Sequence, residues 1–126
     1  MKLKTILISG IIIFVVLLIG FNFKSNDETQ GKYDFFAKCL SDNKVVMYGA
    51  YWCPHCTKQK EMFGSSWKYV TYAECSLPGA TGQTEICKQA EIKGYPTWEF
   101  LDNKKVEGEL SFEKISQYSN CTLPSL

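Results

Sequence analysis

Two cysteines stand three residues apart in the stretch Cys53-Pro54-His55-Cys56. An apolar run precedes this stretch, a helical pattern follows it, and the only histidine of the chain lies between the two cysteines. Residues i and i+3 in the first turn of a helix lie on the same side, so the two thiols can interconvert between dithiol and disulfide. We interpret the motif as a redox site with an exposed Cys53 and a partly buried Cys56.

The position of Cys53 at the start of a helix determines the expected chemistry. Unpaired backbone N–H groups and the positive end of the helix dipole stabilise a thiolate at Cys53. Pro54 suits the first helical turn, and His55 adds a donor or a positive charge. Because a stabilised thiolate leaves readily, the disulfide is more oxidising. A substrate thiolate would attack Cys53, and the second thiol of the substrate would resolve the mixed disulfide, whereas Cys56 would attack in the reverse direction.

Two other interpretations of a C-x-x-C motif are half of a zinc site and a structural bridge. Zinc requires four ligands, commonly from a second C-x-x-C or a histidine pair. The other four cysteines stand alone and there is no second histidine. We therefore expect no metal, and no cofactor beyond the redox-active disulfide Cys53–Cys56.

Composition limits the other function classes. The 126 residues fit one compact domain with a short appendage. The net charge is +1, the charges of both signs are interspersed, and all 14 basic residues are lysines. The absence of a basic stripe argues against a nucleic-acid surface, and the absence of arginine removes bidentate phosphate clamps.

The N-terminal residues 1–24 are expected to anchor the chain in a membrane. Lys2 and Lys4 precede an apolar run from Ile6 to Phe23, which is long enough for a helix of about 27 Å, close to one hydrocarbon core. The lysines favour an inside N-terminus. The alternative is a cleaved signal peptide, although no small-x-small cleavage site is evident. Residues 25–32 are expected to be a linker, and residues 33–126 a domain in an oxidising compartment.

Periodicity and turn signals predict the elements of this domain. Four expected helices cover Tyr33–Leu40, Pro54–Phe63, Thr84–Ile92 and Phe112–Ser119. Four expected strands cover Lys44–Tyr51, Tyr69–Glu74, Trp98–Leu101 and Lys105–Gly108. Gly64-Ser65-Ser66 is expected to end the second helix, in which Met62 and Phe63 pack inward. A strand–helix–strand unit followed by a hairpin and a last helix predicts an α/β fold, a mixed four-stranded sheet with helices on both faces.

The domain resembles the thioredoxin family from Tyr33 to about Cys121. The shared marks are Trp52-Cys53-x-x-Cys56 after a hydrophobic strand and Tyr95-Pro96-Thr97 before a later strand. The resemblance implies a thioredoxin fold, here preceded by one transmembrane helix. It also implies that Pro96 is cis, faces Cys53, and helps Tyr95, Thr97 and Trp52 bind an extended substrate peptide.

More narrowly, the chain is similar to the thioredoxin-like domains that partner bacterial vitamin K epoxide reductase (VKOR) homologues. The stretches that carry this similarity are Phe36–Leu40, Tyr48–Cys56, Glu74–Ser76, Cys87 and Gly94–Trp98. The Cys-Pro-His-Cys tetrapeptide also matches the periplasmic DsbA oxidants, whose large helical insertion is absent here. The resemblance implies a dithiol oxidant that takes electrons from exported proteins during folding and passes them to a quinone-linked, VKOR-like membrane enzyme.

The chain departs from the family at Met47, where many thioredoxins carry a buried acid that accepts a proton from the second cysteine. Glu74 or Glu99 are candidate substitutes. For the remaining cysteines we expect two structural disulfides, Cys75–Cys87 around a Pro/Gly-rich loop and Cys39–Cys121. The alternative is that one of these pairs relays electrons to a partner.

The leading hypothesis is a thiol–disulfide oxidoreductase on a single-pass anchor in a bacterial membrane, with its domain on the periplasmic side. One alternative is a reductase or isomerase fed by a transmembrane electron donor. Another is a redox-silent module that binds extended peptides, against which the intact C-x-x-C argues.

Overall fold

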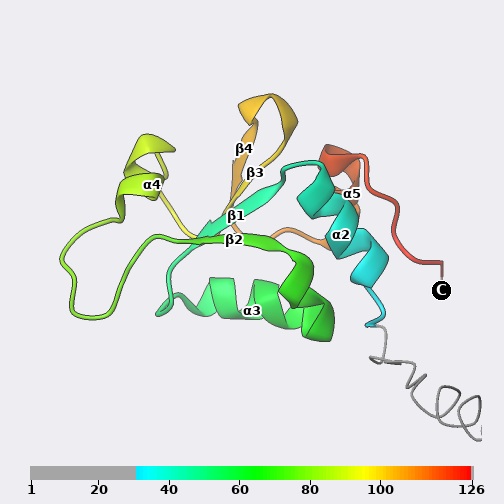
Figure 1. Cartoon of the computed structure of the whole chain (residues 1–126), viewed down its shortest axis with the longest axis horizontal. Coiled ribbons are helices and arrows are strands. Elements are labelled where there is room, and N and C mark those ends of the chain that lie inside the picture. Colours follow the sequence, from blue (N-terminus) through cyan, green and yellow to red (C-terminus); the bar gives the residue numbers. More distant parts are fainter. Residues whose placement is uncertain (1–30, 126) are drawn as a thin grey trace, which may run out of the picture.

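A computed structural model of the chain describes residues 31–125 (Figure 1). The helices are α2 (Asp34–Asp42), α3 (Pro54–Phe63), α4 (Glu85–Gln89) and α5 (Phe112–Ser119), with 3-10 helices η1 (Gly64–Tyr69) and η2 (Leu101–Asn103). The strands are β1 (Val46–Gly49), β2 (Thr71–Glu74), β3 (Thr97–Glu99) and β4 (Lys105–Glu107). Within residues 31–125 no helix is long and apolar enough to cross a membrane. The predicted anchor, residues 1–24, and most of the linker lie outside the described residues.

The four strands form one sheet in the order β2-β1-β3-β4. Strand β1 is parallel to β2 and antiparallel to β3, and β3 is antiparallel to β4. The parallel pair requires a crossover, which α3 and η1 provide, whereas the β3–β4 pair is a hairpin. The predicted mixed four-stranded sheet flanked by helices is confirmed.

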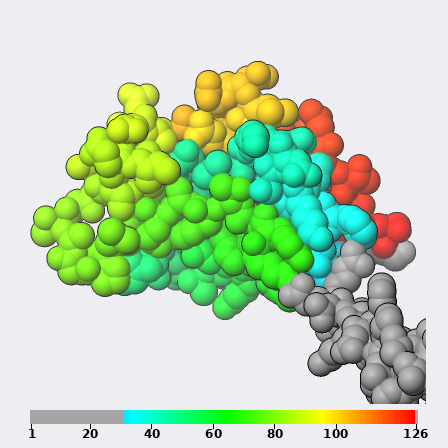
Figure 2. Space-filling model, in the orientation of Figure 1, coloured from blue at the N-terminus to red at the C-terminus, as the bar shows by residue number. Residues whose placement is uncertain are grey.

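Alternation along the central strand β1 separates two apolar clusters. Met47 belongs to the larger cluster, which collects side chains from α2, α3, β3 and α5. Tyr48 belongs to the smaller cluster, which contains Cys75, Cys87 and Ile92 around α4. Successive residues of a strand point to opposite faces, so each face of the sheet has its own core. Figure 2 shows α4 and the loop before it, in yellow-green, at the opposite side of the view from α2, in cyan.

Several predicted boundaries are wrong for local reasons. The strand expected over Lys44–Tyr51 ends at Gly49, because a turn follows in which the Cys53 N–H donates to the Ala50 carbonyl at 3.0 Å. The helix α3 ends at Phe63 with Gly64 as its C-cap, as predicted, but the 3-10 helix η1 follows directly and runs to Tyr69, so β2 begins at Thr71 rather than Tyr69.

The inward face of α3 also differs from the prediction. Met62, expected to pack inward, is 36% exposed, whereas Phe63 is buried as expected and the polar side chain of Gln59 is fully buried beside it. The buried residues Cys56, Gln59 and Phe63 follow each other at intervals of three and four, which is the spacing of one helix face. Met62 lies outside that series.

Candidate active site

The turn between β1 and α3 holds the two reactive cysteines. Cys53 is the N-cap residue of α3 with extended backbone angles, and Pro54 occupies the first helical position. The Cys56 N–H donates to Cys53 Sγ at 3.2 Å, and the two sulfur atoms lie 2.7 Å apart. This is a capping interaction in which sulfur takes the place of the usual oxygen acceptor. A shift of about 0.7 Å would bring the sulfurs to bonding distance.

Both thiols are shielded from solvent. Cys53 is 4% exposed and Cys56 is 1% exposed, so the prediction of an exposed Cys53 is wrong. The physical reason is that the Cys53 sulfur turns inward to accept the Cys56 N–H, while the preceding Trp52 is 59% exposed. Burial raises the pKa of the Cys56 thiol well above its ordinary value, the hydrogen bond with Cys53 adds to this, and Lys60 partly opposes it.

His55 lies at the surface, where its Nδ1 pairs with Glu109 Oε1. Lys58 Nζ lies 4.0 Å from the same carboxylate oxygen. Glu109 is therefore a site neighbour that the sequence did not identify, because it lies 54 residues further along the chain.

The residues expected to bind substrate come from two segments of the sequence, one with Trp52 and the other with Tyr95, Pro96 and Thr97. The Tyr95–Pro96 peptide bond is cis, and Pro96 is fully buried. Tyr95 packs edge-on against Trp52, with ring centroids 5.9 Å apart. The Thr97 hydroxyl donates to the Gly94 carbonyl at 2.8 Å, and Thr97 begins β3. The structure thus brings Trp52 to the Tyr95–Pro96 segment across more than forty residues of sequence.

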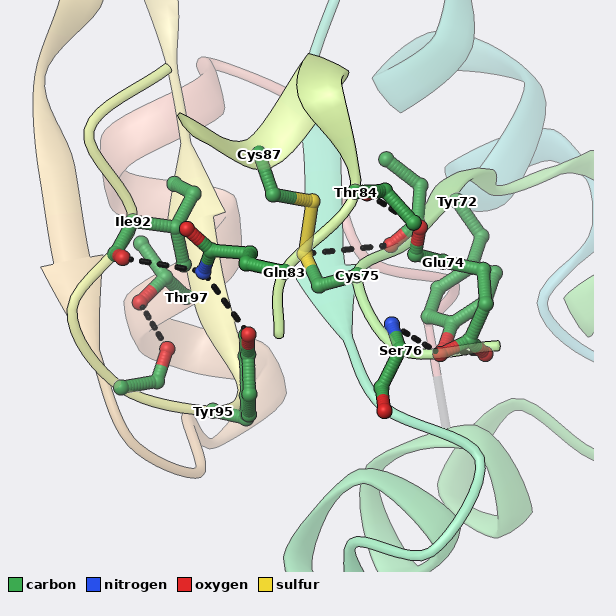
Figure 3. The surroundings of a disulfide bond; sticks show 12 residues. Tyr72, Glu74, Cys75, Ser76, Gln83, Thr84, Cys87, Ile92, Tyr95 and Thr97 are labelled. Carbon is green, nitrogen blue, oxygen red and sulfur yellow. Dashed lines mark hydrogen bonds between the residues drawn. A yellow bond between two sulfur atoms is a disulfide. The ribbon is translucent and has the colours of Figure 1, made fainter. Parts of the chain in front are cut away.

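Hydrogen bonds fix the positions of these two aromatic side chains. Trp52 Nε1 donates to Ser76 Oγ at 3.0 Å, and the Tyr95 hydroxyl accepts from Gln83 Nε2 at 2.7 Å. Both partners belong to the loop between β2 and α4, which Figure 3 shows around a disulfide. This loop therefore supports the rim of the site.

The other four cysteines form two disulfides. Cys75–Cys87 joins the end of β2 to α4, and Cys39–Cys121 joins α2 to the segment after α5 (Figure 3 shows the first pair). These are the two pairs named from the sequence. Cys75 and Cys87 are both fully buried.

Of the two acids considered as substitutes for the one missing at position 47, Glu99 lies on the wrong face of the sheet. Glu99 pairs with Val46 in the register, on the opposite face from Met47, and its carboxylate contacts Lys105 Nζ at 3.4 Å. Met47 itself is fully buried in the larger core. The register instead aligns Glu74 with Gly49, on the same face as Met47.

Glu74 accepts three hydrogen bonds from residues close to the cysteines. Its Oε1 accepts the backbone N–H groups of Tyr51 and Ser76, each at 3.0 Å, and its Oε2 accepts the Tyr72 hydroxyl at 2.7 Å. Tyr72 was not among the residues predicted from the sequence, although the period-two pattern of β2 places it on the face of Glu74.

Comparisons with known proteins show the family to which the chain is related. The family model described as Thioredoxin matches residues 26–119. The thiol-disulfide oxidoreductase LTO1 of Arabidopsis thaliana is 38% identical over 91 residues, which are 69% of this chain and 24% of that protein. The chain thus spans about a quarter of the length of this relative. A crystal structure of Plasmodium falciparum thioredoxin is 33% identical, with a TM-score of 0.40, over 59% of this chain and 69% of the other.

The matched region contains the whole sheet, both reactive cysteines and the cis-proline. A dithiol at the start of a helix is the arrangement required for exchange with a disulfide. On this evidence, the chain belongs to the thioredoxin family of thiol–disulfide oxidoreductases.

Proposed function

We propose that this protein is an extracytoplasmic, membrane-tethered oxidant that introduces disulfides into exported proteins. The observation that carries the proposal is the hydrogen bond from the Cys56 N–H to Cys53 Sγ at the start of α3. A donor at this position stabilises the Cys53 thiolate, which exists only in the reduced form of the pair. Stabilising the reduced form makes the disulfide a stronger oxidant.

Two further features point the same way. The first turn of α3 carries no acidic residue that would oppose the thiolate. The buried Met47 provides no carboxylate at the position where many thioredoxins have one. A pair that has no carboxylate directly beside its second thiol is expected to be slower as a general reductant than a thioredoxin that has one.

The reaction proceeds by two displacements at sulfur. A substrate thiolate attacks Cys53 of the Cys53–Cys56 disulfide, and Cys56 leaves and takes up a proton. A second substrate thiol loses its proton and attacks the mixed disulfide, which releases Cys53 as a thiolate. The substrate has then lost two electrons and gained a disulfide, while the pair has gained two electrons. We propose that a quinone-linked, VKOR-like membrane partner re-oxidises it.

The substrate is proposed to bind as an extended segment along Trp52 and the Tyr95–Pro96–Thr97 segment. The fixed contact between Trp52 and Tyr95 provides an apolar rim, since the Trp52 ring is more than half exposed. Aromatic side chains of this kind supply a large contact area at low cost in conformational entropy.

The chemistry of the cysteines supports the proposed compartment. Two disulfides within a domain of this size are typical of an oxidising environment, since cytosolic thiols are kept reduced. The apolar N-terminal stretch of the sequence supports a tether on the outer side of a bacterial membrane.

A direct assay of direction tests the proposal. The oxidised full-length chain is mixed with an equimolar reduced peptide that carries two cysteines, and in parallel the chain with excess dithiothreitol is mixed with insulin. We expect rapid, stoichiometric oxidation of the peptide and slow reduction of insulin. Cys53→Ser is the control that should abolish both reactions. Fast insulin reduction with little peptide oxidation would support the reductase alternative, and no exchange in either direction would support the redox-silent alternative.

The partner is tested in cells by trapping thiols with acid and labelling them with a maleimide of high mass. We expect the Cys53–Cys56 pair to be mainly oxidised, and to become reduced when the quinone pool is depleted. A pair that stays reduced under normal conditions contradicts the proposed direction.

A further inference from the structure

Cys56 shares a small space with a tyrosine hydroxyl. A Cβ atom added at Gly49 would lie 3.0 Å from Cys56 Sγ, 3.2 Å from Tyr72 Oη and 2.9 Å from Tyr72 Cε2. The thiol and the hydroxyl therefore border the same point above β1, and the absence of a side chain at Gly49 lets both approach it closely. With 1% of Cys56 exposed, bulk water has little direct access to the thiol.

The hydroxyl of Tyr72 is already committed as a donor. It donates to Glu74 Oε2 at 2.7 Å, and Figure 3 shows the two side chains together at the end of β2. A phenol oxygen whose hydrogen is engaged still has lone pairs for accepting a proton. Burial, together with Glu74, raises the pKa of Tyr72, so this hydroxyl stays protonated at neutral pH.

Several charged or titratable groups face the Cys56 thiol. Cys53 and Lys60 face Cys56 from α3, and Tyr72 faces it from β2 with Glu74 behind, whereas β1 contributes Gly49. Lys60 Nζ lies 3.7 Å from the centroid of the Tyr72 ring and favours an anion at Cys56. The site thus combines a lysine that stabilises the thiolate with a nearby tyrosine hydroxyl that is hydrogen-bonded to a carboxylate.

We propose that Tyr72 and Glu74 form the proton relay of Cys56, in place of the acid that is missing at position 47. When Cys56 attacks the mixed disulfide at Cys53, its S–H proton passes to Tyr72 Oη while the Tyr72 proton passes to Glu74 Oε2. Cys56 is left as a thiolate, Tyr72 stays neutral and Glu74 becomes protonated, to be discharged to solvent. In the oxidising direction the same path returns a proton to Cys56 as it leaves Cys53. The relay rests on thiol–disulfide exchange at this pair, in either direction.

One reagent separates the two cysteines. The reduced full-length chain is mixed with excess 5,5′-dithiobis(2-nitrobenzoate) in a stopped-flow instrument. Cys53 attacks first and releases one thionitrobenzoate, and Cys56 then displaces the second from the mixed disulfide. Two absorbance phases report the two steps. If the first phase is absent, the assignment of Cys53 as nucleophile fails, which is distinct from failure of the relay.

We expect Tyr72→Phe and Glu74→Gln to slow the second phase by roughly 100-fold at pH 7, a typical contribution of a positioned base. The rate of the second phase in these variants should rise about tenfold per pH unit, because hydroxide replaces the relay, while the wild-type profile is flatter. The first phase should keep its rate. Glu74→Gln retains an oxygen for the N–H groups of Tyr51 and Ser76.

Tyr48→Phe is the matched control. Tyr48 also pairs with an acid, Glu99, but it lies in the smaller cluster on the other face of the sheet. The relay is overturned if Tyr72→Phe leaves the second phase unchanged, slows both phases alike, slows the second phase without changing its pH profile, or matches Tyr48→Phe. Because Tyr72→Phe removes a single oxygen, the test does not depend on whether Glu74→Gln folds.

Discussion

Gln59 forms two hydrogen bonds with the backbone of Leu110, although the two residues are 51 positions apart in sequence. The Gln59 amide donates to the Leu110 carbonyl at 3.1 Å, and its oxygen accepts the Leu110 N–H at 2.8 Å. The same oxygen accepts Trp98 Nε1 at 3.3 Å. A fully buried side chain of α3 thereby satisfies the segment before α5 and one strand of the sheet, and it fixes the helix that carries the cysteines.

We expect Gln59→Leu to lower the free energy of unfolding by about 2 to 4 kcal/mol. Leucine keeps the volume but leaves the backbone groups of Leu110 and the Trp98 indole without partners in the core. Urea unfolding of the full-length chain measures the loss. Gln89→Leu is the control, because that amide bonds Glu85 on the exposed surface of α4, and it should change stability by less than about 0.5 kcal/mol. A loss below about 1 kcal/mol for Gln59→Leu contradicts the account.

The two disulfides are expected to differ in their contribution to stability. Cys39–Cys121 closes a sequence separation of 82 residues, and Cys75–Cys87 one of 12. The chain-entropy model gives about 4.5 and about 3 kcal/mol, because the longer loop restricts the unfolded chain more. Replacing each pair by serines and measuring urea unfolding tests the order. A larger loss from the Cys75/Cys87 variant means that loop entropy is not the dominant effect.

Alkaline pH is expected to destabilise the fold. Burial raises the pKa of Tyr48 from 10.0 to about 12, and the hydrogen bond with Glu99 adds to the shift. In the unfolded chain this tyrosine ionises near pH 10, while the folded chain retains the proton, so the free energy of unfolding falls between pH 10 and 12. Below pH 10 both states are protonated and this contribution is constant.

Tyr48→Phe tests that interpretation. The variant should show a shallower fall in the free energy of unfolding between pH 10 and 12, measured by urea unfolding at intervals from pH 9 to 12. Identical slopes for the two proteins would show that other groups cause the alkaline loss.

Trp52 is expected to act in substrate binding. Trp52→Ala removes the exposed ring that packs against Tyr95, and we expect kcat/KM for a disulfide-exchange peptide to fall about tenfold, the equivalent of about 1.4 kcal/mol. Stability should change little. Phe35→Ala, an exposed aromatic on α2, is the matched control and should leave kcat/KM unchanged. Equal effects of the two variants would remove Trp52 from the proposed binding surface.

The sequence predicted the order of elements well, because hydrophobic periodicity and turn residues are local signals. The last helix, Phe112–Ser119, has the predicted bounds, since Ser111 accepts the Lys114 N–H as a cap and Asn120 adopts a left-handed conformation after it. Hydrophobic periodicity did not predict the burial of Gln59. This polar side chain is buried because it forms hydrogen bonds with residues from distant segments of the sequence. Burial of Cys53 was missed for a related reason, since the sequence does not show where a sulfur points.

The site residues likewise divide into those that local motifs predict and those that only the fold brings together. The reactive pair and the proline that precedes β3 follow from contiguous motifs, and the structure places them in the expected elements. The partners Glu109 and Tyr72 come from other elements, and strand register decides which residues reach the cysteines. Register depends on pairing across the sheet, so a single strand does not reveal it.

The reduction potential of the Cys53–Cys56 pair directly tests whether the pair is an oxidant. The full-length chain is equilibrated in glutathione buffers, and the fraction of free dithiol is measured by alkylation. The account predicts a potential near or above roughly −150 mV, in the range of strong oxidants. A value near roughly −270 mV, characteristic of a reductant, would contradict it.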